Sequence, residues 1–77
     1  MSYKVLETIV LARDLPGHNL RAGDLGAVVQ TYEPGGLEVE FVTASGRTEA
    51  LVTLREEDVR PVADNDIVTV RSLARTA

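Results

Sequence analysis

The segment from Leu37 to Leu54, LEVEFVTASGRTEALVTL, limits what this chain can fold into more than any other feature. Its first part alternates apolar side chains with glutamates, which is the period of a strand with one buried face. Turn residues follow, and a second run with apolar residues in alternation begins after them. The segment therefore predicts an antiparallel hairpin with one face in a core and the other face in water.

A two-residue loop at Ser45 and Gly46, with Ala44 opposite Arg47, sets the register of this hairpin. Three apolar cross-strand pairs then share one face: Phe41 with Ala50, Val39 with Val52, and Leu37 with Leu54. A slip of one residue would turn the glutamates toward the core. We therefore expect this register in the folded chain.

Three further runs have strand character, at residues 7–15, 25–32 and 59–62. In the second run either Val28 or Val29 faces inward, and a bulge near Gln30 would let the strand change faces. Pro16 and Gly17 suit the central positions of a type II turn. The EPGG segment at 33–36 predicts a second Pro-Gly turn, and REED at 55–58 predicts a polar turn with one turn of 3₁₀ helix.

Five short strands with tight turns predict an all-β fold, a small SH3-like barrel, because a small sheet leaves open edges unless it curls closed. The alternative is an open meander that needs a partner to cover its face. We expect a barrel domain at residues 1–62 and a C-terminal tail at residues 63–77. The apolar stretch at 67–73 in the tail is a sixth strand, a cover over a barrel edge, a disordered segment, or a strand that pairs with a second copy in a homodimer.

The composition excludes several classes of function. The sequence has no cysteine, which removes disulfides, thiolate metal sites and thiol nucleophiles. The N-terminal apolar run is interrupted by Glu7, and IVLA at 9–12 is too short for a signal sequence or a membrane span. We therefore expect a cytoplasmic protein that makes no contact with membranes.

The charge disfavours a nucleic-acid partner. The formal net charge is −4, and the basic residues stand singly along the chain. Binding to a phosphate backbone needs clustered Lys and Arg.

No catalytic or cofactor motif is present. The single histidine, His18, stands in a turn, and acid–base catalysis needs a base with an orienting partner. The GDLG segment at 23–26 has neither the lysine nor the spacing of a phosphate-binding loop. Gly23 and Gly26 instead suggest tight backbone angles, with the Asp24 side chain closing the turn. We expect no enzyme activity, no cofactor and no metal site.

The segment DLPGHNLRAGDLGAVVQTYEPGGLEVEFVTASGRTEALVTLREEDVRPV, residues 14–62, resembles a bacterial family, domain of unknown function 4926. The positions that carry the resemblance are Asp14, Leu15, Pro16, Leu20, Gly23, Asp24, Gly26, Val28, Val29, Val39, Phe41, Leu54, Arg60 and Pro61. The resemblance implies an SH3-like barrel and implies no activity. More distantly, GDLGAVV is similar to the KOW motif of ribosomal and transcription-factor barrels, and the strand layout is similar to small barrel subunits of photosynthetic and redox complexes.

These observations favour a non-catalytic protein-interaction module, either an accessory subunit or the neutralising, antitoxin- or immunity-like partner of a bacterial protein. Tyr and Arg are frequent interface anchors. The predicted partner-binding residues are His18, Asn19, Arg21, Tyr32, Val42 and Leu51. The alternative is a KOW-like RNA-binding module that uses Arg13, Arg21 and Arg47.

Overall fold

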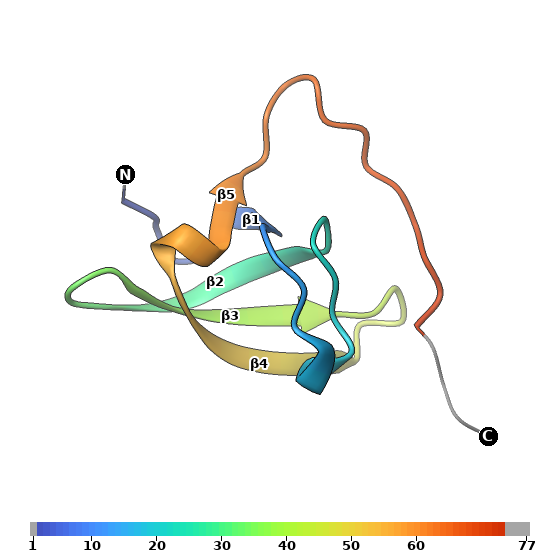
Figure 1. Cartoon of the computed structure of the whole chain (residues 1–77), viewed down its shortest axis with the longest axis horizontal. Coiled ribbons are helices and arrows are strands. Elements are labelled where there is room, and N and C mark those ends of the chain that lie inside the picture. The colour runs from blue at the N-terminus through green and yellow to red at the C-terminus, as the bar shows by residue number, and fades with distance from the viewer. Residues whose placement is uncertain (1, 74–77) are drawn as a thin grey trace.

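The structure is a computed structural model that describes residues 2–73, and within them it contains five antiparallel strands and no α-helix (Figure 1). The strands are β1 (Thr8–Leu11), β2 (Leu25–Tyr32), β3 (Gly36–Val42), β4 (Thr48–Arg55) and β5 (Val59–Pro61). Two short 3₁₀ helices are η1 (Pro16–His18) and η2 (Glu56–Asp58). The predicted all-β class is confirmed, as is the 3₁₀ turn before the last strand.

The strands form one sheet in the order β4-β3-β2-β1-β5. β2, β3 and β4 form a meander, and β5 returns after η2 to pair with β1. Figure 1 shows the sheet curling around its own core, which is the arrangement of an SH3-like barrel. No helix among the described residues has the length and hydrophobicity to cross a membrane.

The β3–β4 hairpin keeps the predicted register but not the predicted loop. Phe41 lies opposite Ala50, and the two other expected pairs also form. The Thr43 N–H donates to the Arg47 carbonyl at 2.8 Å, so the loop has three residues, 44–46, instead of two. Gly46 has φ 89°, the left-handed residue that closes a three-residue hairpin. A bulge absorbs the extra residue, because Val42 lies opposite Thr48.

Strand β2 contains the predicted bulge. Its register against β3 shifts between Val28 and Gln30, so Val29 is the additional residue. Val28 is fully buried opposite Val39, which decides between the two valines. Beyond the bulge, residues 30–32 of β2 are exposed, so the buried part of the strand ends at Val28.

Strand β1 is shorter than the predicted run 7–15. The Leu11 carbonyl accepts the Gly23 N–H at 2.8 Å, and the next N–H, of Ala12, turns to the Asp58 carbonyl at 2.7 Å. The chain therefore leaves β2 after Leu11. Residues 12–24 form a long loop that folds over one end of the barrel.

The predicted type II turn at Pro16–Gly17 is wrong. The segment forms η1, whose first position suits proline because proline lacks an N–H. The residue with left-handed angles is Asn19, at φ 59°, and Gly17 has no positive φ. Leu15 and Leu20 bridge each other on either side of η1 and are both buried.

The core is mainly aliphatic, with Phe41 and Tyr3 as its aromatic members. Its buried members are Tyr3, Ile9, Leu11, Leu15, Leu20, Val28, Leu37, Val39, Phe41, Val52, Leu54 and Val59. Gly26 lies against this core: a Cβ there would stand 2.6 Å from Val39 Cγ1 and 2.9 Å from Phe41 Cε1. The expectation that Gly26 supplies a tight backbone angle is therefore wrong, because its role is close packing. Gly23 does supply one, with φ +99°.

After β5 the chain arches away and returns past the β3–β4 hairpin (Figure 1). We call residues 63–73 the strap. The strap forms no strand, which removes a sixth strand from the four alternatives for 67–73. Asp66 fixes the start of the strap through an ion pair with Arg60 at 2.9 Å. Residues 74–77, the remainder of the expected tail, lie outside the described residues.

Candidate functional site

The structure divides the six predicted partner-binding residues between two regions. Tyr32 and Leu51 lie on the solvent side of the β2–β3–β4 meander. His18, Asn19 and Arg21 lie in the loop that folds over one barrel end. Val42, at the last position of β3, lines a hollow at that same barrel end.

The outer face of the meander combines apolar and acidic groups. We define the outer face as Tyr32, Glu38, Glu40, Leu51 and Thr53. Leu51 is 56% exposed and lies directly opposite Glu40, while Tyr32 is 46% exposed. An apolar side chain at the middle of a strand thus faces solvent beside two carboxylates.

Hydroxyl groups orient both carboxylates of the outer face. Thr53 Oγ1 donates to Glu38 Oε1 at 2.7 Å, and the Tyr32 hydroxyl donates to the same oxygen at 3.4 Å. Thr48 Oγ1 donates to Glu40 Oε2. The acidic groups are held in place on the sheet and keep acceptor capacity toward solvent.

At the barrel end, Asp24 binds an arginine of the strap. Arg71 Nε donates to Asp24 Oδ1 at 2.8 Å, and Arg71 Nη2 donates to Oδ2 at 2.6 Å. Arg71 Nη2 also donates to the Asn19 carbonyl at 3.2 Å. This two-point fork is the strongest geometry that a guanidinium and a carboxylate form.

The pair is partly shielded from water. Side-chain exposure is 25% for Arg71 and 18% for Asp24. Hydrogen bonds from Arg71 hold the pKa of Asp24 below its usual range, against the opposing effect of burial, and the Arg21 N–H adds to the lowering. Asp24 is therefore an anion throughout the physiological range.

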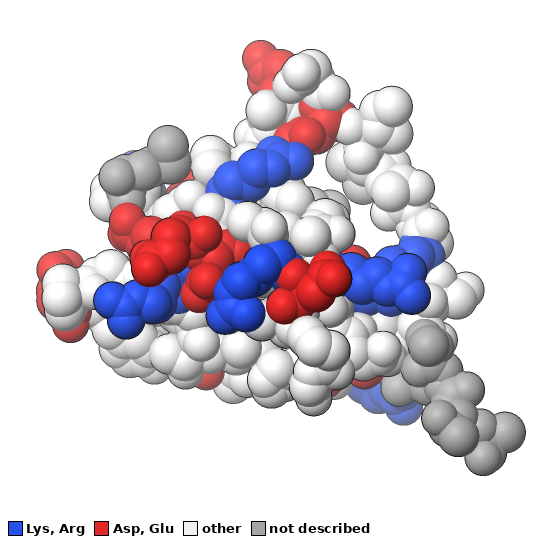
Figure 2. All heavy atoms as spheres, viewed as in Figure 1, with Lys and Arg blue, Asp and Glu red and all other residues white. Residues whose placement is uncertain are grey.

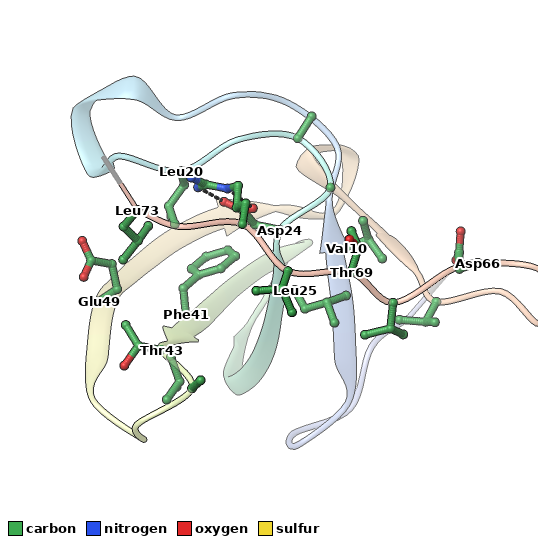
Figure 3. A pocket seen from close by; sticks show the side chains of 18 of the residues that line it. Val10, Leu20, Asp24, Leu25, Phe41, Thr43, Glu49, Asp66, Thr69 and Leu73 are labelled. Atoms are coloured by element: carbon green, nitrogen blue, oxygen red, sulfur yellow. Dashed lines mark hydrogen bonds and ion pairs between the residues drawn. The ribbon is translucent and has the colours of Figure 1, made fainter. Parts of the chain in front are cut away.

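A hollow of about 760 Å³ lies between the strap and the barrel (Figure 3). Its barrel wall includes Val10, Leu20, Leu25, Phe41 and Val42. Figure 3 shows the strap passing over Leu20, Leu25 and Phe41, with the Asp24 ion pair at one side of the hollow. The strap spans this surface without filling it.

The loop at 21–24 is a turn and not a phosphate cradle. The Arg21 N–H donates to Asp24 Oδ2 at 2.8 Å, and the Ala22 N–H donates to Asp14 Oδ1 at 2.9 Å. The N–H groups of Gly23 and Asp24 donate to backbone carbonyls. The backbone donors that would have to meet a phosphate are already engaged by protein groups, and Asp24 closes the turn as the sequence predicts.

A second aspartate, Asp58, stabilises the fold through hydrogen bonds to the protein itself. Its carboxylate accepts Arg13 Nε at 2.7 Å and the Arg55 N–H at 2.9 Å, which caps η2. These bonds, led by that of Arg13, hold the pKa of Asp58 below its usual range. The sequence predicted a polar turn with one turn of 3₁₀ helix here but not the ion pair, because nothing local shows that Arg13 reaches Asp58.

The three arginines named for the RNA-binding alternative, Arg13, Arg21 and Arg47, differ in their surroundings. Arg13 is engaged with Asp58, whereas Arg21 and Arg47 are exposed in separate loops. Figure 2 shows Lys and Arg side chains next to Asp and Glu side chains on the face it presents. A phosphate-binding surface needs cations that are not neutralised by neighbouring carboxylates, so RNA binding stays a prediction without added support.

His18 stands exposed on η1. Within residues 2–73 no three His, Cys, Asp or Glu side chains are grouped so that they could hold a metal ion.

A family model, domain of unknown function (DUF4926), matches residues 5–61. The chain belongs to this family. The matched segment contains all five strands, both 3₁₀ helices and Asp24, whereas Arg71 and the rest of the strap lie outside it. No curated protein and no solved structure matches the chain.

Proposed function

We propose that this protein is a non-catalytic protein-interaction module of the cytoplasm, acting as an accessory subunit or as the neutralising partner of a bacterial protein. The outer face is its contact surface. The partner that fits is a protein surface with Lys or Arg at its centre and apolar side chains on either side.

The observation that carries this proposal is the pairing of exposed Leu51 with oriented Glu38 and Glu40. Single exposed leucines are common and mean little alone. Here the two carboxylates, which hydroxyls already hold, lie on β3 between exposed Leu51 of β4 and exposed Tyr32 of β2. Groups oriented before binding lose less conformational freedom when a partner docks.

The charge of the protein supports the same conclusion. Acidic residues outnumber basic ones, with a formal net charge of −4. A surface of this kind attracts a basic partner and speeds the encounter. Leu51 and Tyr32, on either side of the carboxylates, would then supply the desolvated apolar contacts of the interface.

A photo-crosslinking amino acid at position 51 tests the proposal in the native host. We expect one discrete adduct from position 51 and none from position 5, because Val5 is similarly exposed but lies off the outer face. Calorimetry with the purified partner should then show about tenfold or greater weakening for Leu51→Ala, as for an apolar side chain buried at an interface. Unchanged affinity for Leu51→Ala and Tyr32→Ala would overturn the assignment of the outer face.

A further inference from the structure

We propose that the barrel end around Asp24 is a binding site for an extended, arginine-bearing segment of a partner protein, and that Arg71 of the strap occupies this site in the free chain. The site lies apart from the outer face, and it does not depend on the function proposed above. It consists of the Asp24 carboxylate, the Asn19 carbonyl and the apolar wall of the hollow.

The recognition chemistry is visible in how Arg71 is held. The guanidinium meets both oxygens of Asp24 and one backbone carbonyl, so three of its N–H groups have directed acceptors. A lysine would reach these acceptors only as a point charge. The geometry is therefore selective for arginine.

The acceptors are fixed by the fold and not by the strap. The Asp24 carbonyl accepts the Leu11 N–H at 2.8 Å, and Asp24 Oδ2 accepts the Arg21 N–H. Asn19 is set by the left-handed end of η1. A site of this rigidity would remain formed when the strap leaves.

The strap itself is a poor ligand apart from Arg71. Ile67 is 89% exposed, Val68 71% and Val70 93%, so these three side chains bury little against the barrel. Beyond Asp66, the half-buried strap residues in the described part of the chain are Arg71 and Leu73. The strap stays in place because its attachment to β5 gives it a high effective concentration, on the order of millimolar.

The hollow indicates room for a better ligand. About 760 Å³ remains between the strap and Val10, Leu25, Phe41 and Val42. Of these wall residues Leu25 is 40% and Val42 48% exposed. An extended segment that carries an arginine and also inserts aliphatic side chains would cover both of them in addition to meeting Asp24. Such a segment would displace the strap.

A peptide titration followed by amide chemical shifts tests the proposal on the full chain. The probe is the acetylated and amidated peptide VTVRSL, the sequence of residues 68–73. We expect the Arg71→Ala variant to bind it with shifts at Gly23, Leu25 and Val42. Wild type should bind about tenfold or more weakly, because its site is occupied for most of the time.

Two controls isolate the role of arginine. The same peptide with alanine at the arginine position should cause no shifts at these amides. Adding Asp24→Asn to Arg71→Ala should abolish binding of VTVRSL, while unchanged amide shifts of Val28 and Val39 show that the barrel is intact. The comparison between wild type and Arg71→Ala decides the matter even if the Asp24 variant is unstable.

Three results would overturn the proposal. They are no binding of VTVRSL to Arg71→Ala at millimolar concentration, equal binding by wild type and Arg71→Ala, and equal binding of the arginine and alanine peptides. If light scattering shows a wild-type dimer that Asp24→Asn dissolves, the occupant is the strap of a second copy and not a partner segment.

Discussion

The barrel and the strap are built by different forces. The barrel buries twelve apolar side chains in one cluster, and every strand pairs with a neighbour. The strap exposes most of its aliphatic side chains and is attached by two ion pairs, Arg60–Asp66 and Arg71–Asp24. The contrast teaches that hydrophobic sequence does not by itself predict burial: IVTV at 67–70 is as apolar as the runs in β1 and β4, yet it remains in solvent.

Removing a core side chain should have the largest effect. Leu37 is 1% exposed, so Leu37→Ala should lower the free energy of unfolding by about 2–5 kcal/mol. Leu51→Ala on the opposite face of the same hairpin should change it by less than about 0.5 kcal/mol. Denaturant titrations measure both values. A similar loss of unfolding free energy for the two variants would mean that the outer face also contributes to the stability of the fold.

Adding a side chain at Gly26 should have the next largest effect. Gly26→Val would force atoms into the space held by Val39 and Phe41 and should cost about 1–3 kcal/mol. For a domain of this size that loss lowers the melting temperature by about 5–20 °C. Gly17→Ala is the matched control, because a Cβ there meets nothing within 4 Å. A melting temperature for Gly26→Val equal to wild type would contradict the close packing.

Acid should weaken the barrel through Asp58. Its pKa is lower in the folded chain than in the unfolded chain, so the unfolded state binds the proton more tightly. The stabilisation is complete above the unfolded value of about 3.9 and is lost as the pH falls through the folded value. Thermal melts between pH 7 and pH 2.5 measure this loss. Asp58→Asn should be less stable at pH 7 by about 1 kcal/mol and less sensitive to acid; an equally steep decline would assign the effect to other carboxylates.

Releasing the strap should have the smallest effect on stability. Arg71→Ala removes a partly exposed ion pair, which contributes about 1 kcal/mol or less. The melting temperature should therefore fall by a few degrees at most, and Ser72→Ala should leave it unchanged. A large loss in calorimetric melts of Arg71→Ala would show that the strap is part of the cooperative barrel.

The sequence was sufficient for the register of the β3–β4 hairpin because apolar and polar residues alternate within its strands. Leu37, Val39 and Phe41 mark one face, and a shift of register would bury glutamates, so the three core pairs were predictable. The loop length was not, because a bulge restored the register after a three-residue loop. Alternation in the strands contains no information about how many residues the turn holds.

Long-range polar contacts escaped prediction for a different reason. Asp24 and Arg71 are 47 residues apart, and Arg13 and Asp58 are 45 residues apart. No local pattern relates either pair. The sequence contained one signal, because Arg71 is the single charged residue in the otherwise uncharged run IVTVRSL. A lone cation in such a run indicates that it pairs with an acidic group elsewhere in the chain.

Native-state amide hydrogen exchange on the wild-type chain tests the division between barrel and strap most directly. Among the described residues, the strap's backbone–backbone hydrogen bonding consists of the Asp66 N–H to the Ala63 carbonyl. We expect the amides of Val68 and Val70 to exchange within about tenfold of unprotected rates, and the amides of Val28 and Val39 to exchange only through global unfolding. Protection of the strap amides equal to that of the barrel amides would contradict this account.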